Sequence, residues 1–383
     1  MRYAGARAAA RVPRRAAAVC HHVLHRSPAH GRHTKVTTQT TPPDGAPRRA
    51  VLGTWPTPLE PAPRLALALG LEAEDLWIKR DDLTGLGGGG NKVRKLEWLC
   101  GAALADGATV LVTTGAPQSN HARLTAAAAA RLGLGAVLVL AGRPGASSSG
   151  NLALDGLLGA RVVWAGDTGA AALDSVAHKI AEKLSRQGAV PSLVPFGGSS
   201  VLGARGYAEC GRELLAQAPG LDTVVTAVGS GGTMAGLVGE LGAHRVLGVH
   251  VGAVSAPAVT VSRLASGLTG TYCPPESLRL RMDQVGAGYG TLTEPARSAL
   301  LLAARTEGLV LDPVYTGRAL AGLAAAVADG TVRPGQRTVL LHSGGLPGLF
   351  GHAPALAAAE SGLTAEDTPE DTAGDGGEGG VGF

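Results

Sequence analysis

The stretch DTVVTAVGSGGTMAGLVGEL, residues 222–241, decides the fold class. It begins with a β-branched, apolar run, continues through a glycine turn and ends in a segment of helical composition. This order predicts a buried strand, a tight turn and a helix, which together are the repeating unit of a parallel α/β sheet. The turn Gly229-Ser230-Gly231-Gly232-Thr233 would place backbone N–H groups and two hydroxyl groups at a helix N-terminus. It therefore predicts a site for a phosphate group.

Two other phosphate-binding patterns fit this turn less well. A dinucleotide site needs an acidic residue at the end of the next strand, but RVLGVHV at 245–251 is followed by Gly252-Ala253. A P-loop needs a Gly-Lys-Ser/Thr triplet, and none follows the turn. A single phosphate is therefore favoured over a dinucleotide, and an oxidoreductase is the weakest alternative.

The same alternation of strand and helix patterns continues along the chain, and it predicts an α/β fold with parallel sheets. The expected strands lie at 76–79, 109–114, 136–141, 161–164, 222–228, 245–251 and 338–343, and the expected helices lie at 91–105, 119–132, 173–187, 203–217, 232–241, 293–306 and 317–328.

The charge of +4 is concentrated at the two ends of the 383-residue chain. Residues 1–50 contain ten Lys or Arg and one acidic residue, whereas residues 360–383 contain seven acidic residues and no Lys or Arg. The segment between them is nearly neutral, which gives little support to nucleic-acid binding. We expect 1–51 to be a disordered Arg-rich extension, with a transit peptide as the less favoured alternative, and 360–383 to be an acidic disordered tail.

The cysteines and the apolar runs indicate the cellular location. The four cysteines, Cys20, Cys100, Cys210 and Cys273, show neither a C-x-x-C pair nor metal-ligand spacing. We therefore expect no metal site, no disulfide framework and a reducing, cytoplasmic location. No apolar run reaches the length of about 18 residues that a membrane-spanning helix needs.

Lys92 is a candidate nucleophile. It follows four glycines and Asn91 and opens the helical pattern at 91–105, in a chain with six lysines and 28 arginines. A helix N-terminus disfavours a cation and so lowers the pKa of an amine, which favours Schiff-base formation. From spacing alone, a solvated surface lysine is an equally good interpretation.

A second candidate site is Gln118-Ser119-Asn120-His121, between an expected strand and an expected helix. Ser119 or Asn120 could simply cap the helix, which is the commoner role of such residues, and His121 could be a surface histidine. The functional interpretation is a cradle whose free N–H groups bind a substrate carboxylate.

Seven motifs together resemble the family of pyridoxal-phosphate (PLP) enzymes that contains D-cysteine desulfhydrase and 1-aminocyclopropane-1-carboxylate deaminase. The resemblance runs from about Leu52 to about Phe350. It implies fold type II, with two open-twisted α/β domains and the cofactor in the cleft between them. The large domain would comprise 52–94 and 199–359, and the small domain 95–198. The motifs are LWIKRDDLTGLGGGGNKVRKLEWL, TTGAPQSNHARLTAAAAARLGL, VPFGGSSVLGARGY, VGSGGTMAGL, GAGYGTLTEPA, LDPVYTGRALAGL and LLHSGGLPGLF.

The resemblance also implies roles for individual residues. Lys92 matches the Schiff-base lysine, Asn120 is expected near the pyridoxal hydroxyl, and Ser343 falls near the position of the pyridine nitrogen. Gly87-Gly88 replaces a bulkier pair, so we expect a looser loop before Lys92. The implied catalytic residues are Lys92, Ser119, Tyr289 and Tyr315; the cofactor-binding residues are Lys92, Asn91, Asn120, Gly229, Ser230, Gly231, Gly232, Thr233 and Ser343; and the substrate-binding residues are Ser119, Asn120, His121 and Thr316.

Two positions bear on the substrate. Members of the family that open the cyclopropane ring typically have Glu after the tyrosine of DPVY and read QSNQ, whereas this chain has Thr316 and His121. The expected reaction is therefore β-elimination from D-cysteine, giving pyruvate, ammonia and hydrogen sulfide. The alternatives are the deaminase, a cysteate sulfo-lyase and a catalytically silent PLP-binding protein. We expect a small amino-acid substrate, no nucleic-acid or membrane partner, and a homodimer.

Overall fold

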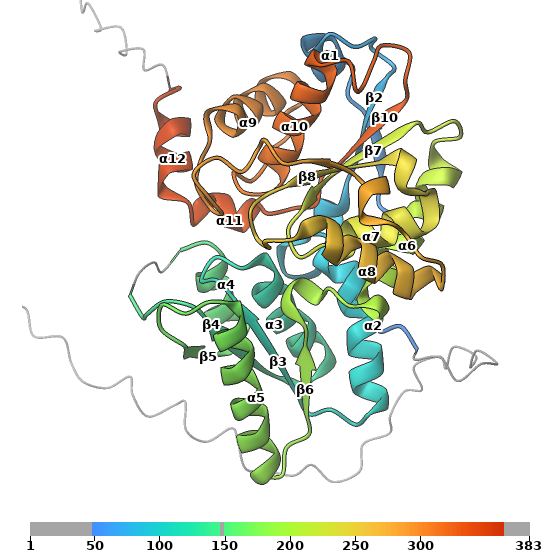
Figure 1. The fold of residues 1–383 in the computed structure, drawn as a ribbon. Helices are drawn as coiled ribbons and strands as arrows, with labels where there is room; N and C mark the ends of the chain where they lie inside the picture. Colours follow the sequence, from blue (N-terminus) through green and yellow to red (C-terminus); the bar gives the residue numbers. More distant parts are fainter. Residues whose placement is uncertain (1–47, 146–148, 364–383) are drawn as a thin grey trace, which may run out of the picture. The chain divides into compact units, whose positions relative to one another are not determined.

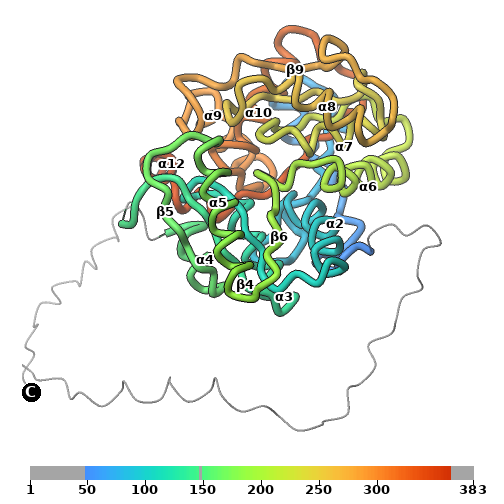
Figure 2. The backbone as a smooth tube through the Cα atoms, turned by 60° about the horizontal axis from the view of Figure 1, so that its bottom comes forward, coloured from blue at the N-terminus to red at the C-terminus, as the bar shows by residue number. Residues whose placement is uncertain are grey.

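The computed structural model describes residues 48–145 and 149–363, which form two sheets with helices packed on them (Figures 1 and 2). Within these ranges, no helix combines the length and the apolar character needed to cross a membrane. The expected N-terminal extension and acidic tail lie almost entirely outside the described residues.

The larger sheet has six strands, and all neighbouring strands are parallel except β1 and β2. In register, Leu340 of β10 pairs with Ile78 on one side and with Val225 on the other. The carboxyl ends of these strands therefore lie along one edge of the sheet. The order across the sheet is β1 (Leu59–Pro61), β2 (Leu76–Lys79), β10 (Thr338–Leu341), β7 (Thr223–Val228), β8 (Val246–His250) and β9 (Arg279–Arg281).

The smaller sheet has four parallel strands. Its central pair, β3 and β4, is in register from Val110 opposite Gly135 to Gly115 opposite Leu140. All four strands fall between residues 95 and 198. The order is β5 (Arg161–Trp164), β4 (Gly135–Leu140), β3 (Val110–Gly115) and β6 (Pro191–Val194).

Helices cover both faces of each sheet, as parallel sheets require. Helices α1, α9 and α10 pack on one face of the larger sheet, and α6, α7 and α8 on the other. Helices α2, α3 and α4 cover one face of the smaller sheet, and α5 covers the other. Their bounds are α1 (Pro63–Leu69), α2 (Lys92–Ala105), α3 (Asn120–Leu132), α4 (Asn151–Leu157), α5 (Ala170–Arg186), α6 (Val201–Gln217), α7 (Gly232–Leu241), α8 (Pro257–Thr269), α9 (Glu294–Glu307) and α10 (Thr316–Ala328), followed by α11 (Leu346–Phe350) and α12 (Ala353–Glu360).

The alternation of side chains along β7 explains how one strand contributes to two cores. Val225 and Ala227 pack with α9 and α10, whereas Val224 and Val228 pack with α6, α7 and α8. Successive residues of a strand point to opposite faces, so a strand buried on both sides must be apolar throughout. This is why DTVVTAV reads as a continuous apolar run.

All seven strands and all seven helices expected from the sequence are present, with ends shifted by three residues at most. The proposed domain boundary at residues 94 and 95 falls inside the continuous helix α2, so the division at those bounds stays a prediction. The folded part also begins before Leu52: Ala50 is buried and its N–H donates to Glu97 O at 2.8 Å.

Candidate active site

A cavity of about 730 Å³, including its open mouth, lies where elements of the two sheets meet. Twelve of the fourteen residues predicted to form the site line it. The two exceptions are Gly232 and Thr316. The twelve are Asn91, Lys92, Ser119, Asn120, His121, Gly229, Ser230, Gly231, Thr233, Tyr289, Tyr315 and Ser343.

Lys92 is the first residue of α2 and reaches into this cavity. Its Nζ donates to Asn91 Oδ1 at 2.8 Å and lies 5.8 Å from the centroid of the Tyr315 ring. Burial lowers the pKa of Lys92 to about 8, opposed by the charge of Asp312 and reinforced by that of Arg123. The lowered pKa agrees with the sequence prediction, but its main cause is burial rather than the helix N-terminus.

Asn91 joins the start of α2 to two other parts of the cavity. Its Nδ2 donates to Thr233 Oγ1 at 3.1 Å, at the start of α7. Its backbone N–H donates to Ser343 O at 3.0 Å, in the loop after β10. Through these bonds Asn91 ties Lys92 to the glycine turn and to the Ser343 loop.

The glycine turn 229–233 connects β7 to α7, as predicted. Gly231 has φ +87°, a backbone conformation that residues with a side chain rarely adopt. Beside the turn, Ser199 Oγ accepts the N–H of Gly232 at 3.1 Å and lies 2.7 Å from Ser230 Oγ. The turn therefore offers a helix N-terminus and several hydroxyl groups to an anion.

Lys95 also lines the cavity and was missed by the sequence reasoning. Its fully buried Nζ donates to Gly197 O at 3.2 Å and to Ser199 Oγ at 3.1 Å, next to the glycine turn. Burial, together with the charge of Lys92, lowers its pKa well below the ordinary value. An anion bound at the turn would reverse this by favouring the protonated amine. The sequence could have indicated Lys95, because it lies three residues after Lys92 on the same predicted helix, and residues three apart on a helix share a face.

Ser119, Asn120 and His121 lie at the junction of β3 and α3. Ser119 caps α3 through its Oγ, which accepts the N–H of Ala122 at 3.1 Å, so it both caps the helix and lines the cavity. His121 is buried, not a surface residue, and its Nε2 lies 2.9 Å from Thr113 Oγ1. Burial and the two nearby lysines lower the pKa of His121 well below the ordinary value, so the ring is neutral.

Tyr289 and Tyr315 approach the cavity from two different segments. Tyr315 directly precedes α10, and Tyr289 lies in the glycine-rich loop before α9. Their hydroxyl oxygens are 2.6 Å apart and their rings meet edge to face. Desolvation raises the pKa of both hydroxyl groups, so both are protonated at neutral pH.

Thr316 is placed differently from the prediction. It is buried, does not line the cavity, and its Oγ1 donates to Asp312 Oδ1 while accepting the N–H of Asp312. The carboxylate of Asp312 also accepts the N–H groups of Val314, Tyr315 and Thr316. The structure therefore does not place Thr316 on the wall of the cavity, and its hydroxyl instead helps Asp312 to hold Tyr315.

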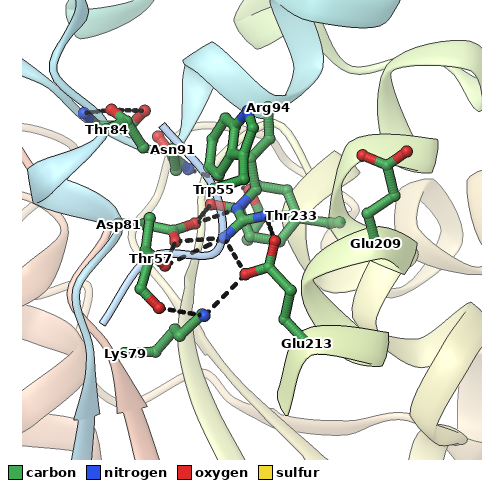
Figure 3. Close-up of polar contacts among 12 residues, drawn as sticks. Trp55, Thr57, Lys79, Asp81, Thr84, Asn91, Arg94, Glu209, Glu213 and Thr233 are labelled. Atoms are coloured by element: carbon green, nitrogen blue, oxygen red, sulfur yellow. Dashed lines mark hydrogen bonds and ion pairs between the residues drawn. The ribbon is translucent and has the colours of Figure 1, made fainter. Parts of the chain in front are cut away.

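A buried ion network of Lys79, Asp81, Arg94 and Glu213 packs behind α2, on the side away from the cavity, and holds this helix in place (Figure 3). Arg94, two residues after Lys92, makes a bidentate ion pair with Asp81 and a second pair with Glu213, and its guanidinium stacks 4.1 Å from the Trp55 ring centroid. Burial alone would raise the pKa of Asp81, but the charge and hydrogen bonds of Arg94 lower it below the ordinary value. The opposite face of the same helix presents Lys92 and Lys95 to the cavity.

The loop 87–90 before Lys92 is held rather than loose. All four glycines have positive φ, and a Cβ at Gly87 would lie 2.6 Å from Ala127 Cβ. The buried Arg123 on α3 donates to the carbonyl oxygens of both Gly87 and Gly89. The glycines allow a close contact that a side chain would prevent, and whether the loop is looser than in relatives with a bulkier pair stays a prediction.

A family model described as pyridoxal-phosphate dependent enzyme matches residues 51–344. The chain belongs to this family of PLP-dependent enzymes. The donors in the cavity fit the cofactor: an amine of lowered pKa for its aldehyde, and a glycine turn with Lys95 beside it for its phosphate. Lys92 would hold the aldehyde carbon, and residues 229–233 with Lys95 would hold the phosphate.

The most informative relatives carry two different names. The D-cysteine desulfhydrase of Klebsiella pneumoniae (strain 342) is 40% identical over 328 residues, covering 81% of this chain and 97% of that protein. A protein of Pyrococcus abyssi that carries the provisional name 1-aminocyclopropane-1-carboxylate deaminase is 40% identical over 317 residues, covering 79% of this chain and 93% of the relative.

Two solved structures confirm the fold class of this PLP enzyme. A homologue of 1-aminocyclopropane-1-carboxylate deaminase aligns with a TM-score of 0.74 at 36% identity, covering 81% of this chain and 96% of that one. A threonine deaminase of T.th. aligns with a TM-score of 0.53 at 25% identity, covering 76% of this chain and 92% of that one. The chain therefore has the α/β architecture of fold type II PLP enzymes.

Proposed function

We propose that this enzyme catalyses PLP-dependent β-elimination on a small amino acid, with D-cysteine as the substrate. The reaction consumes water and converts D-cysteine to pyruvate, ammonia and hydrogen sulfide. The relative from Klebsiella pneumoniae bears the name of this activity and matches this chain over most of its length. Bound PLP supplies an electron-withdrawing group conjugated to the substrate Cα.

One observation favours elimination over ring opening: among the described residues, no Asp or Glu lines the cavity. The buried acid Asp312, whose charge acts on Lys92, already accepts four hydrogen bonds from the segment 314–316. The Ser343 hydroxyl, which lines the cavity, is a neutral partner for the pyridine nitrogen. A ring without a carboxylate partner withdraws electrons less strongly, which suits rapid loss of a thiol better than cleavage of a carbon–carbon bond.

Three groups of residues carry out substrate binding, proton removal and proton donation. The N–H groups at the start of α3, around Ser119, bind the substrate carboxylate. Lys92 Nζ, with its pKa lowered to about 8, accepts the proton from Cα. A protonated hydroxyl of the Tyr289 and Tyr315 pair donates a proton to the leaving sulfur.

Side-by-side turnover assays of the purified enzyme test this proposal. D-cysteine, L-cysteine, 1-aminocyclopropane-1-carboxylate and cysteate are supplied in turn, and keto acid, ammonia, sulfide and sulfite are measured. We expect sulfide and pyruvate in equal amounts from D-cysteine. Sulfite from cysteate, or 2-oxobutanoate from the cyclopropane substrate, with D-cysteine inert, would replace the proposal by one of the rival activities. Absence of keto acid from every substrate would indicate a silent PLP-binding protein.

The resemblance also underlies the proposal of a homodimer, and the cysteine pattern underlies that of a cytoplasmic location. Light scattering coupled to gel filtration should give the mass of two chains for the PLP-loaded protein. A mass of one chain would contradict the dimer, and fractionation of the producing cells tests the location.

A further inference from the structure

Arg123 is a buried residue of α3 whose side chain can only donate hydrogen bonds. Its Nε donates to Asn151 Oδ1 at 3.1 Å, and its Nη2 lies 3.4 Å from Asn120 Oδ1. Because guanidinium has no acceptor, the atoms that face it must be oxygens. Arg123 therefore dictates which way the neighbouring amide groups are turned.

Asn151, the first residue of α4, is turned by this contact and is itself fully buried. With Oδ1 toward Arg123, its Nδ2 faces the other way and donates to Gln118 O and to Asn120 Oδ1, each at 3.0 Å. A backbone carbonyl such as Gln118 O can only accept, so it supports the same orientation independently.

Asn120 is the third amide in the series and lines the cavity. Its Oδ1 receives hydrogen bonds from both Asn151 Nδ2 and Arg123 Nη2, which fix the orientation of the amide. Its Nδ2 has no hydrogen-bond partner among residues 48–145 and 149–363. The group left to face the cavity is an N–H donor.

We infer that Arg123 and Asn151 are positioning residues that orient the Asn120 amide, so that its Nδ2, and not its Oδ1, faces the pyridoxal hydroxyl that the family resemblance places beside Asn120. An unconstrained amide could equally present its oxygen, which would repel the ionised oxygen of that hydroxyl. The inference uses the cofactor site of the proposed function and is independent of which amino acid is the substrate.

The substitution Asn151→Asp tests this with little change in volume. The new carboxylate keeps an acceptor for Arg123 Nε but loses the donor to Asn120 Oδ1. The shorter of the two bonds to Asn120 Oδ1 is then replaced by repulsion between oxygens, and the bond from Arg123 at 3.4 Å is the weaker one, so Asn120 should turn its N–H groups toward the carboxylate and its oxygen toward the cavity. A donor stabilises the ionised ring oxygen, so its loss should raise the apparent pKa of the visible-absorption change of the PLP-loaded enzyme by about one unit or more.

Gln217→Glu is the matched control, because it makes the same amide-to-acid change outside the cavity. The side chain of Gln217 bonds to Lys79 and to Thr57 instead. It should leave the spectral titration unchanged. Lys95, His121 and Asp155 are present in all of these proteins, so their own ionisations cancel in the comparison. Circular dichroism of each protein reports whether it is folded.

A double-mutant cycle distinguishes a loss of Asn120 orientation from a general disturbance of the structure around Asn151. Asn120→Asp presents only acceptors to the cavity, so it should raise the apparent pKa as Asn151→Asp does, and the double variant should add nothing further. If Asn151→Asp titrates like the wild type while Asn120→Asp is shifted, the inference is overturned. Arg123→Lys, which keeps the charge but loses the fork of donors, gives the same test if Asn151→Asp does not fold.

A wild-type enzyme that absorbs in the visible but does not turn over D-cysteine would refute only the proposed substrate.

Discussion

The hydroxyl oxygens of Tyr289 and Tyr315 lie 2.6 Å apart, so each phenol is the other's hydrogen-bond partner within the cavity. One of the two hydroxyl groups must donate to the other, and the second hydroxyl keeps a proton that it can give to a bound molecule. Asp312 holds Tyr315 from the α10 side by accepting its backbone N–H at 2.9 Å. The pair therefore resembles a single acid built from two side chains rather than two independent groups.

Replacing either tyrosine by Phe should lower kcat for D-cysteine by roughly 10²-fold or more, as expected for loss of a positioned general acid. Because the two hydroxyl groups act as one unit, Tyr289→Phe combined with Tyr315→Phe should cost little more than the worse single variant. Steady-state kinetics of the three variants measure this. Tyr272→Phe, at a side chain that is 72% exposed, is the control and should keep wild-type activity. Additive losses would show that the tyrosines act separately.

The rate of PLP attachment to the apoenzyme should depend on pH with a midpoint near 8. Only the neutral amine of Lys92 attacks an aldehyde, and burial lowers the pKa of this amine from 10.5 to about 8. The rate, followed by the growth of visible absorption, should fall about tenfold for each pH unit below the midpoint. A midpoint near 10.5 would mean that the attacking lysine is an ordinary, exposed one.

Asp81→Asn should destabilise the fold by about 3 kcal/mol, because it leaves the buried guanidinium of Arg94 with one carboxylate instead of two. Urea unfolding of the apoenzyme measures the loss. Asp283→Asn breaks an ion pair with Arg281 at a carboxylate that is 46% exposed, and it should cost less than about 1 kcal/mol. Equal losses in both variants would contradict the role given to the network behind α2.

Asp155→Asn should remove a pH-dependent term from the stability. Burial raises the pKa of Asp155 to about 7, against the opposing charge of Arg123, and neither of its carboxylate oxygens has a hydrogen-bond partner in the part of the chain that the structure describes. Between its unfolded value of 3.8 and about 7, the folded state binds more protons, so stability falls as pH rises through this window. The wild type should therefore lose more unfolding free energy than the variant between pH 5 and 8, on the order of 2 kcal/mol. Parallel pH curves would contradict this.

The sequence predicted the elements with strong periodicity and missed elements whose pattern was weak or typical of the other secondary structure. Strand β7 and helix α7 were placed within one residue because an apolar strand pattern, a glycine turn and a helical pattern follow one another there. Strand β6, Pro191–Val194, was missed because four residues that begin with proline carry almost no periodic signal. Helix α8 was missed because its Val and Thr residues are typical of strands, and packing outweighs that preference.

Within the site, the sequence located residues that belong to motifs and missed residues that act through tertiary contacts. Arg123 and Asn151 are 28 residues apart and meet only after α3 and α4 pack together. Thr316 was assigned to the substrate because of its place after Tyr315, yet its hydroxyl is directed to Asp312. The direction of a side chain depends on the turn that carries it, and no motif specifies that direction.

The covalent attachment of PLP to Lys92 is the claim on which the account depends, and two amines in one cavity make it sharply testable. Borohydride reduction of the PLP-loaded enzyme, followed by peptide mapping by mass spectrometry, reports which amine carries the cofactor. The account predicts the reduced pyridoxyl group on Lys92, with Lys95 unmodified. A label on Lys95 or on any other lysine, or a protein that takes up no PLP, would contradict it.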